Sequence, residues 1–184
     1  MSIFDAHHSF TVFDRYFVSN AAWGFFELKH LQFDYYPKDF KKVAFEKVFA
    51  SLKTYNMLDT SVTLKGQVGN YLTKKIKLSD YMQIQKADLL NTIKSFINEQ
   101  RDLKKDLLRD EREKRFENYF KSFIPDVEHK INQVINSDIN VLRLDLTKND
   151  KEKLAEFATY EYFENYLIEY KSDNSCAVIN LGYD

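Results

Sequence analysis

Apolar residues recur at two spacings along the chain, and these spacings predict a mixture of strands and helices. Alternate apolar positions across residues 9–36 favour two strands, although charged residues interrupt the second. Pro37 suits the first turn of a helix, and apolar residues follow it at helical spacing to Leu52. Residues 60–78 are rich in β-branched side chains around a glycine-containing turn, which favours a hairpin.

One unusually long helix is predicted over about residues 80–124, because 70–124 contains neither glycine nor proline. About 40 helical residues would extend roughly 60 Å, whereas a globule of this length is about 40 Å across. We therefore expect the helix to project, kink or break near 109–115, where seven charged residues follow one another. Its apolar seam, which could be internal packing or a self-association surface, comprises Leu89, Ile93, Phe96, Leu103 and Leu107.

The remaining chain predicts a helix after Pro125 and then strands. Leucines alternate with polar residues in 142–146, as in a half-buried strand. Residues 160–170 fit either a strand or a continued helix, and 176–179 fit a returning strand. The whole pattern predicts an α+β fold with a mixed or antiparallel sheet, as a single domain over 1–184 with a sub-boundary near Pro125.

Composition narrows the function classes. The 184 residues carry a net charge of −1, which disfavours a dedicated nucleic-acid binder but leaves room for a local basic patch. A single cysteine excludes an internal disulfide, and neither a signal peptide nor an apolar run of about 18 residues is present. We expect a soluble cytoplasmic protein. Frequent Lys, Asn, Ile, Phe and Tyr, which AT-rich codons encode, suggest an accessory or mobile-element gene.

Candidate catalytic and metal-binding residues are few. Glu27, His30 and Asp34 would share one face of a helix and could bind a divalent metal, but a strand would separate Glu27 from the others. Cys176 lacks the flanking pattern of a thiol nucleophile and fits a small buried side chain. We predict no cofactor and no metal. The residues interpreted as solvated polar groups are His7, His8, His129, and the pairs Asp102–Asp106 and Glu161–Glu164.

Two groups of residues suggest a surface for another protein. Tyrosine is enriched where proteins meet, and a tyrosine series occupies the tail, although a core face explains it equally well. The charged run adds three arginines. The predicted partner-binding residues are Arg109, Arg112, Arg115, Tyr160, Tyr162, Tyr166 and Tyr170. From these we predict a non-enzymatic protein-binding module that acts stoichiometrically, as an inhibitor, immunity-type or anti-defence protein.

A nucleic-acid-associated protein is the alternative. Lysines interleaved with tyrosines can hold phosphates and stack on bases, although lysines also protect the edge of a hairpin from aggregation. The residues of this patch are Lys65, Tyr71, Lys74, Lys75 and Lys77. A third hypothesis is a small enzyme whose site is assembled from distant residues around His30 and Asp34.

Overall fold

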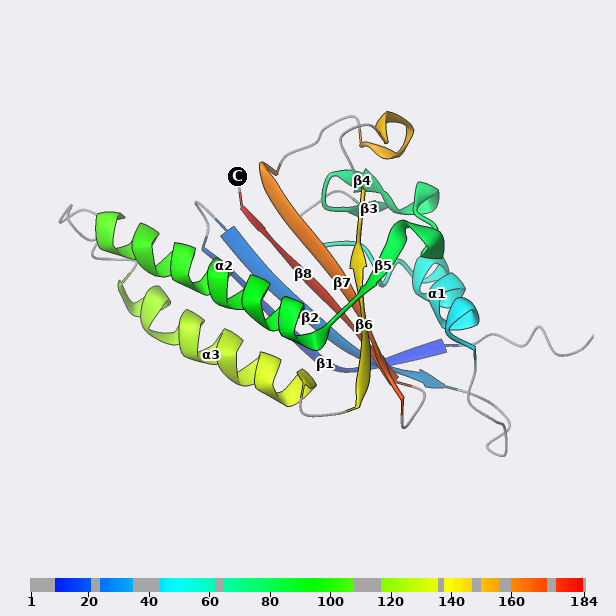
Figure 1. Cartoon of the computed structure of the whole chain (residues 1–184), viewed down its shortest axis with the longest axis horizontal. Helices are drawn as coiled ribbons and strands as arrows, with labels where there is room; N and C mark the ends of the chain where they lie inside the picture. The colour runs from blue at the N-terminus through cyan, green and yellow to red at the C-terminus, as the bar shows by residue number, and fades with distance from the viewer. Residues whose placement is uncertain are drawn as a thin grey trace, which may run out of the picture.

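The chain forms a six-stranded antiparallel sheet covered by helices on both faces, an α+β architecture, in the computed structural model (Figure 1). The strand order is β1-β2-β8-β7-β6-β5, and each neighbouring pair is antiparallel. The strands are β1 (Ser9–Asn20), β2 (Gly24–Asp34), β5 (Tyr81–Ile84), β6 (Ile139–Leu144), β7 (Tyr162–Tyr170) and β8 (Ser175–Tyr183). The helices are α1 (Phe45–Thr54), α2 (Lys86–Leu107) and α3 (Glu117–Ile135).

Short elements complete the described chain. A second, two-stranded sheet joins β3 (Gln67–Val68) to β4 (Tyr71–Leu72), and 3-10 turns follow at η1 (Thr73–Lys75), η2 (Leu78–Asp80) and η4 (Lys151–Lys153). The structure describes residues 9–20, 24–34, 44–61, 65–107, 117–135, 138–146, 150–155, 160–171 and 175–183.

Both faces of the large sheet are buried, and strand β8 shows this directly. Its Ala177 and Ile179 pack beneath α2 and α3, whereas Cys176 and Val178 pack beneath α1 and the segment that follows it. Successive side chains of a strand point to opposite faces, so an apolar run with no alternation marks a strand covered on both sides. The sheet therefore divides the core into two layers.

The predicted helix over 80–124 is not confirmed as one element. Residues 81–84 belong to β5, α2 ends at Leu107, and α3 begins at Glu117. The two helices lie side by side along one face of the sheet (Figure 1). A helix of 22 residues extends about 33 Å, which removes the conflict with the size of the body. The charged run 109–115 lies outside the described residues.

The seam on α2 is internal packing over its first half. Leu89, Ile93 and Phe96 are buried against the sheet, together with Ile97. These side chains are thus not available for the predicted self-association, while the side chains of Leu103 and Leu107 lie outside the described residues.

Pro125 is part of a described helix. It lies inside α3, and strands from both sides of it pair in the same sheet. Proline within a helix removes one backbone hydrogen bond, but the packing of Val127, Ile131 and Val134 into the core retains the helix.

Several other predictions were tested by the described residues. The two N-terminal strands and the returning strand near 176–179 are confirmed as parts of β1, β2 and β8. The strand predicted over 142–146 is confirmed up to Leu144, where β6 ends. The tail is a strand, β7, rather than a continued helix. The hairpin is shorter than 60–78, because 3-10 turns replace its predicted second strand. Helix α1 is confirmed from Phe45 onward, whereas Pro37 lies outside the described residues.

Burial of Cys176 yields a first testable prediction. The side chain lies within β8 at 1% exposure, and burial raises the pKa of its thiol to about 12. The thiolate is the reactive form, so we expect Ellman's reagent at about pH 8 to label the native protein only through unfolding. The labelling rate should rise through the urea transition. Because the unfolded thiol has a lower pKa, unfolded chains lose this proton first, and this group should lower stability between about pH 9 and 12.

Free cysteine labelled under the same conditions is the reference for full reactivity. If the native protein reacts in water at that reference rate, then Cys176 is not in the core.

Candidate functional site

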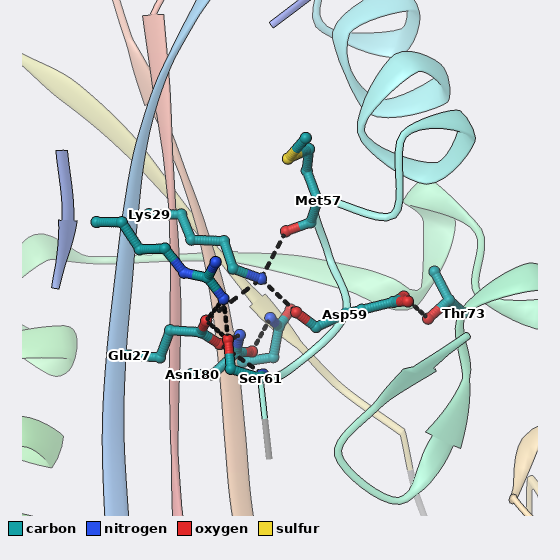
Figure 2. Close-up of polar contacts among 9 residues, drawn as sticks. Glu27, Lys29, Met57, Asp59, Ser61, Thr73 and Asn180 are labelled. Carbon is teal, nitrogen blue, oxygen red and sulfur yellow. Dashed lines mark hydrogen bonds and ion pairs between the residues drawn. The ribbon is translucent and has the colours of Figure 1, made fainter. Parts of the chain in front are cut away.

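A fully buried glutamate lies at the centre of a cluster of hydrogen-bonded polar side chains beside a pocket. Glu27 on β2 is 0% exposed. Its carboxylate accepts hydrogen bonds from Arg15 Nη2 at 3.3 Å, from the Ser61 backbone N–H at 3.2 Å and from the Ser61 hydroxyl. Asn180 Nδ2 on the neighbouring strand β8 donates a fourth at 3.1 Å. A buried charge must be paired and hydrogen-bonded, and Glu27 meets both conditions (Figure 2).

Lys29, two residues along the same strand, supplies a buried opposite charge. Its side chain is 7% exposed, and its ammonium lies 3.5 Å from Glu27 Oε1. It also donates to the backbone carbonyls of Met57 at 3.2 Å and of Asp59. Burial lowers the pKa of Lys29, and the Glu27 carboxylate opposes this effect. All three ammonium protons therefore have acceptors, so Lys29 serves to hold the loop against the sheet (Figure 2).

Arg15 differs from Lys29 in its exposure. Its side chain is 54% exposed. Within the described residues, its Nη2 alone is engaged, donating to Glu27 and to the Ser61 hydroxyl. A guanidinium carries five N–H donors in a planar fork, and these two contacts involve its Nη2 end. Arg15 is directly opposite Lys29 in the β1–β2 pairing, which explains why both cations meet the same carboxylate.

These groups line a pocket of about 360 Å³ between the sheet and the loop after α1. We call it the Arg15 pocket. Its walls carry hydroxyl, amide and aromatic groups as well as the two cations. The lining residues are Arg15, Lys29, Tyr55, Asn56, Met57, Asp59, Thr60 and Ser61.

The loop that closes this pocket is held by Asp59. Its carboxylate accepts from the Gly66 N–H at 2.7 Å and from the Thr73 hydroxyl at 2.6 Å. Asp59 therefore directs its charge toward the β3–β4 segment, while its backbone carbonyl accepts from Lys29 (Figure 2). Arg15 and Lys29 consequently share the one carboxylate of Glu27, and Asp59, which also lines the pocket, adds a second carboxylate there.

A row of polar side chains continues from Glu27 across the sheet. Asn165 Nδ2 donates to Asn180 Oδ1 at 2.6 Å, and the Tyr81 hydroxyl donates to Asn165 Oδ1 at 2.6 Å. Burial raises the pKa of Tyr81, so its hydroxyl remains a donor. Every bond in the row points toward Glu27, which fixes this carboxylate as the final acceptor.

The structure places the predicted tyrosine face largely in the core. Tyr166 and Tyr170 are 0% and 4% exposed and pack beneath α2 and α3. Burial raises the pKa of Tyr166 to about 12. Tyr160 and Tyr162 are half-buried and stack on Phe163 and Tyr183, respectively. Tyr166 and Tyr170 thus belong to a core face, which is the other explanation of the tyrosine series, because β7 is covered on both faces.

The predicted lysine patch is partly brought together. Lys65 and Lys74 line a second pocket, and Lys75 and Lys77 are exposed nearby. Tyr71 is half-buried and donates its hydroxyl to the Leu146 carbonyl at 3.2 Å, so it is a structural residue rather than a stacking platform. The exposed aromatic of this region is Tyr55, which the sequence interpretation missed.

The structure separates two members of the candidate metal group. Glu27 and His30 lie on opposite faces of β2, and His30 stacks on Tyr170 with ring centroids 5.0 Å apart. Among the described residues, no three His, Cys, Asp or Glu side chains gather as a metal-binding group. The side chain of Asp34 is not described, and Arg109, Arg112 and Arg115 lie outside the described residues.

Sequence reasoning missed Arg15, Lys29 and Ser61 as site residues. A signal was present, because Glu27 and Lys29 interrupt the apolar residues Phe25, Phe26, Leu28 and Leu31 of the strand. Two opposite charges on one face of a buried strand indicate a paired polar centre. Ser61 and Asn180 gave no such signal, since they lie 34 and 153 residues from Glu27.

Comparison with known proteins finds no matching family model, no similar curated protein and no similar solved structure. Within the described part of the chain, no helix has both the length and the apolar character needed to cross a bilayer.

Proposed function

We propose that the protein binds a phosphorylated ligand at the Arg15 pocket. The observation that carries the proposal is the half-exposed guanidinium of Arg15, which lines the pocket and is held there by Glu27. A guanidinium fork matches the oxygens of a phosphate in a bidentate manner. Because Glu27 and Ser61 hold one edge of that fork, its orientation is set before a ligand arrives.

The remainder of the pocket fits the same class of ligand. Asn56 adds a side chain that can donate hydrogen bonds, and Tyr55, which is 37% exposed, adds an apolar surface at the same pocket. Tyrosine presents a flat face on which a planar group can stack. A phosphate joined to a planar base would use both features.

Binding is better supported than catalysis. Ser61 donates to Glu27, an arrangement that resembles a nucleophile beside a base. However, a carboxylate offers about four lone-pair positions, and Glu27 already accepts four hydrogen bonds and an ion pair. Glu27 is thus occupied in holding the structure. The protein-binding module stays a prediction, since its arginines lie outside the described residues and two of its four tyrosines are buried.

The Arg15→Ala variant tests the proposal. We expect wild-type protein to bind pyrophosphate and adenosine monophosphate in calorimetric titrations, and Arg15→Ala to weaken both by about tenfold or more. A hydrogen bond to a charged group contributes about 1.5–3 kcal/mol, which corresponds to this range. Arg15→Lys should fall between the two, because a lysine keeps the charge and loses the fork.

Lys94→Ala is the matched control, since Lys94 is an exposed cation on α2, across the sheet from the pocket. Its affinity should equal that of the wild type. Failure of the wild type to bind either anion, or equal binding by Arg15→Ala, would overturn the proposal.

A further inference from the structure

A second cationic pocket lies next to the Arg15 pocket. It has a volume of about 240 Å³, and none of the described residues that line it is acidic. We call it the lysine pocket. It is lined by Lys53, Lys65 and Lys74 together with Asn56, Gly66, Leu72 and Thr73.

The ammonium of Lys53 is fixed at this pocket by backbone acceptors. It donates to the carbonyl of Ile76 at 2.6 Å and to that of Lys74 at 3.2 Å. Asp80, the carboxylate that acts on Lys53, is paired with Lys153 at 2.7 Å. The charge of Lys53 is therefore held in place without a carboxylate bonded to it.

Lys65 and Lys74 are exposed and add two further positive charges. The acidic group nearest to the wall is Asp59, whose carboxylate is bonded to Gly66 and Thr73. Three ammonium groups against this one carboxylate leave the lysine pocket strongly positive. Each lysine ammonium is a compact point charge, and such charges attract the oxygens of phosphate groups.

The two pockets share one wall. Asn56, which adopts a left-handed backbone conformation with φ of 55°, lines both of them. Its neighbour Tyr55 lines the Arg15 pocket and is one of two exposed large apolar side chains in the described part of the chain. An aromatic ring thus stands beside two neighbouring cationic pockets.

We infer that the two pockets bind consecutive phosphates of single-stranded nucleic acid, with a base stacked on Tyr55. This inference rests on the proposed function of the Arg15 pocket and names its ligand. Proteins that bind single strands combine a cationic groove for the backbone with aromatic rings for the bases. A duplex keeps its bases paired and stacked, so it cannot supply a base to Tyr55.

The experiment measures fluorescence anisotropy of a labelled oligo-deoxythymidine strand of about 12 nucleotides. We expect Lys65→Ala/Lys74→Ala to weaken binding about tenfold. The slope of log affinity against log salt should also fall by about 1.4 between roughly 50 and 200 mM salt, because each lysine that neutralises a phosphate of a single strand contributes about 0.7 to that slope. Tyr55→Leu should weaken strand binding by about tenfold and leave pyrophosphate binding unchanged.

Lys94→Ala again serves as the control and should match the wild type in affinity and slope. Lys65 and Lys74 are exposed, and thermal melts of each variant will show that the fold is retained.

The outcomes separate the two proposals. In one outcome, pyrophosphate binding depends on Arg15, but the strand either does not bind or binds equally well to the lysine variant. This outcome overturns the present inference alone. Equal affinity for a duplex of the same length, or an affinity for the mononucleotide that matches the strand, also overturns it. Absence of all anion binding overturns both proposals.

Discussion

Replacing Glu27 by glutamine is expected to destabilise the protein by roughly 3–5 kcal/mol, because the change leaves Lys29 as a buried cation without its counter-charge. Glutamine keeps the volume of the side chain but removes the charge and introduces donors that face Arg15 and Lys29. For a chain of this length, roughly 3 kcal/mol corresponds to a fall of about 6–12 °C in melting temperature. Thermal melts followed by circular dichroism measure this directly.

Two further variants test the cause of the destabilisation. Glu161→Gln changes an exposed glutamate and should alter stability by less than about 0.5 kcal/mol. Adding Lys29→Met to Glu27→Gln should recover part of the stability, since the unpaired buried cation is then removed. If Glu27→Gln melts together with Glu161→Gln, the buried network does not hold the fold.

The stability prediction and the binding proposal concern different parts of the same network. Glu27 holds Arg15 at the mouth of the pocket and holds the loop through Ser61. Loss of Glu27 should therefore weaken both folding and ligand binding, whereas loss of Arg15 should weaken binding more than folding, because Arg15 is half exposed. A comparison of the two variants separates the residue that positions from the residue that binds.

The strands β1, β2, β6 and β8 could largely be predicted from sequence, because their residues are strongly apolar or β-branched. The helical part could not be predicted in the same detail. The sequence pattern places residues 81–84 in a helix, yet they pair with 141–144 as an edge strand. Local propensity cannot anticipate such pairing, because the partner strand lies about 60 residues away. A continuous helix over 80–124 would be longer than a globule of this size. This mismatch was compatible with a projecting, kinked or broken helix, so it did not single out the break between α2 and α3.

The site could be predicted to a smaller extent. The lysines of residues 65–77 can be recognised as a patch, because they are close together in the sequence. Arg15 and Lys29 cannot, because the register of β1 against β2 sets them side by side, and no local pattern encodes that register. The sequence left open whether Tyr166 and Tyr170 face a partner or the core, since alternation alone does not reveal that a second layer covers the strand.

The position of the lysine pocket depends on a close contact at Gly69. This glycine lies between β3 and β4 with φ of +56°, and a Cβ atom added to it would overlap the ring of Phe163. That ring is itself held by stacking on Phe25, with centroids 6.4 Å apart, and on Tyr160 at 6.0 Å. The β3–β4 hairpin thus lies against an aromatic cluster on β7 and β2.

Gly69→Ala is therefore expected to destabilise the protein by about 2–5 kcal/mol, the sum of backbone strain near 1–2 kcal/mol and of overpacking near 1–3 kcal/mol. Gly66→Ala is the matched control: Gly66 also has positive φ, at +87°, but nothing lies within 4 Å of its added Cβ. It should show the backbone strain alone. The difference between the two melting temperatures measures the contact with Phe163.

A double variant identifies that contact as the cause. Phe163→Leu removes the ring edge that the alanine would overlap, so the combined effect of Gly69→Ala and Phe163→Leu should be smaller than the sum of the single effects. Strict additivity, or a Gly69→Ala destabilisation no larger than that of Gly66→Ala, would show that the hairpin does not pack on Phe163. In that case the wall formed by Gly66, Leu72 and Thr73 would lack the support that positions Lys65 and Lys74.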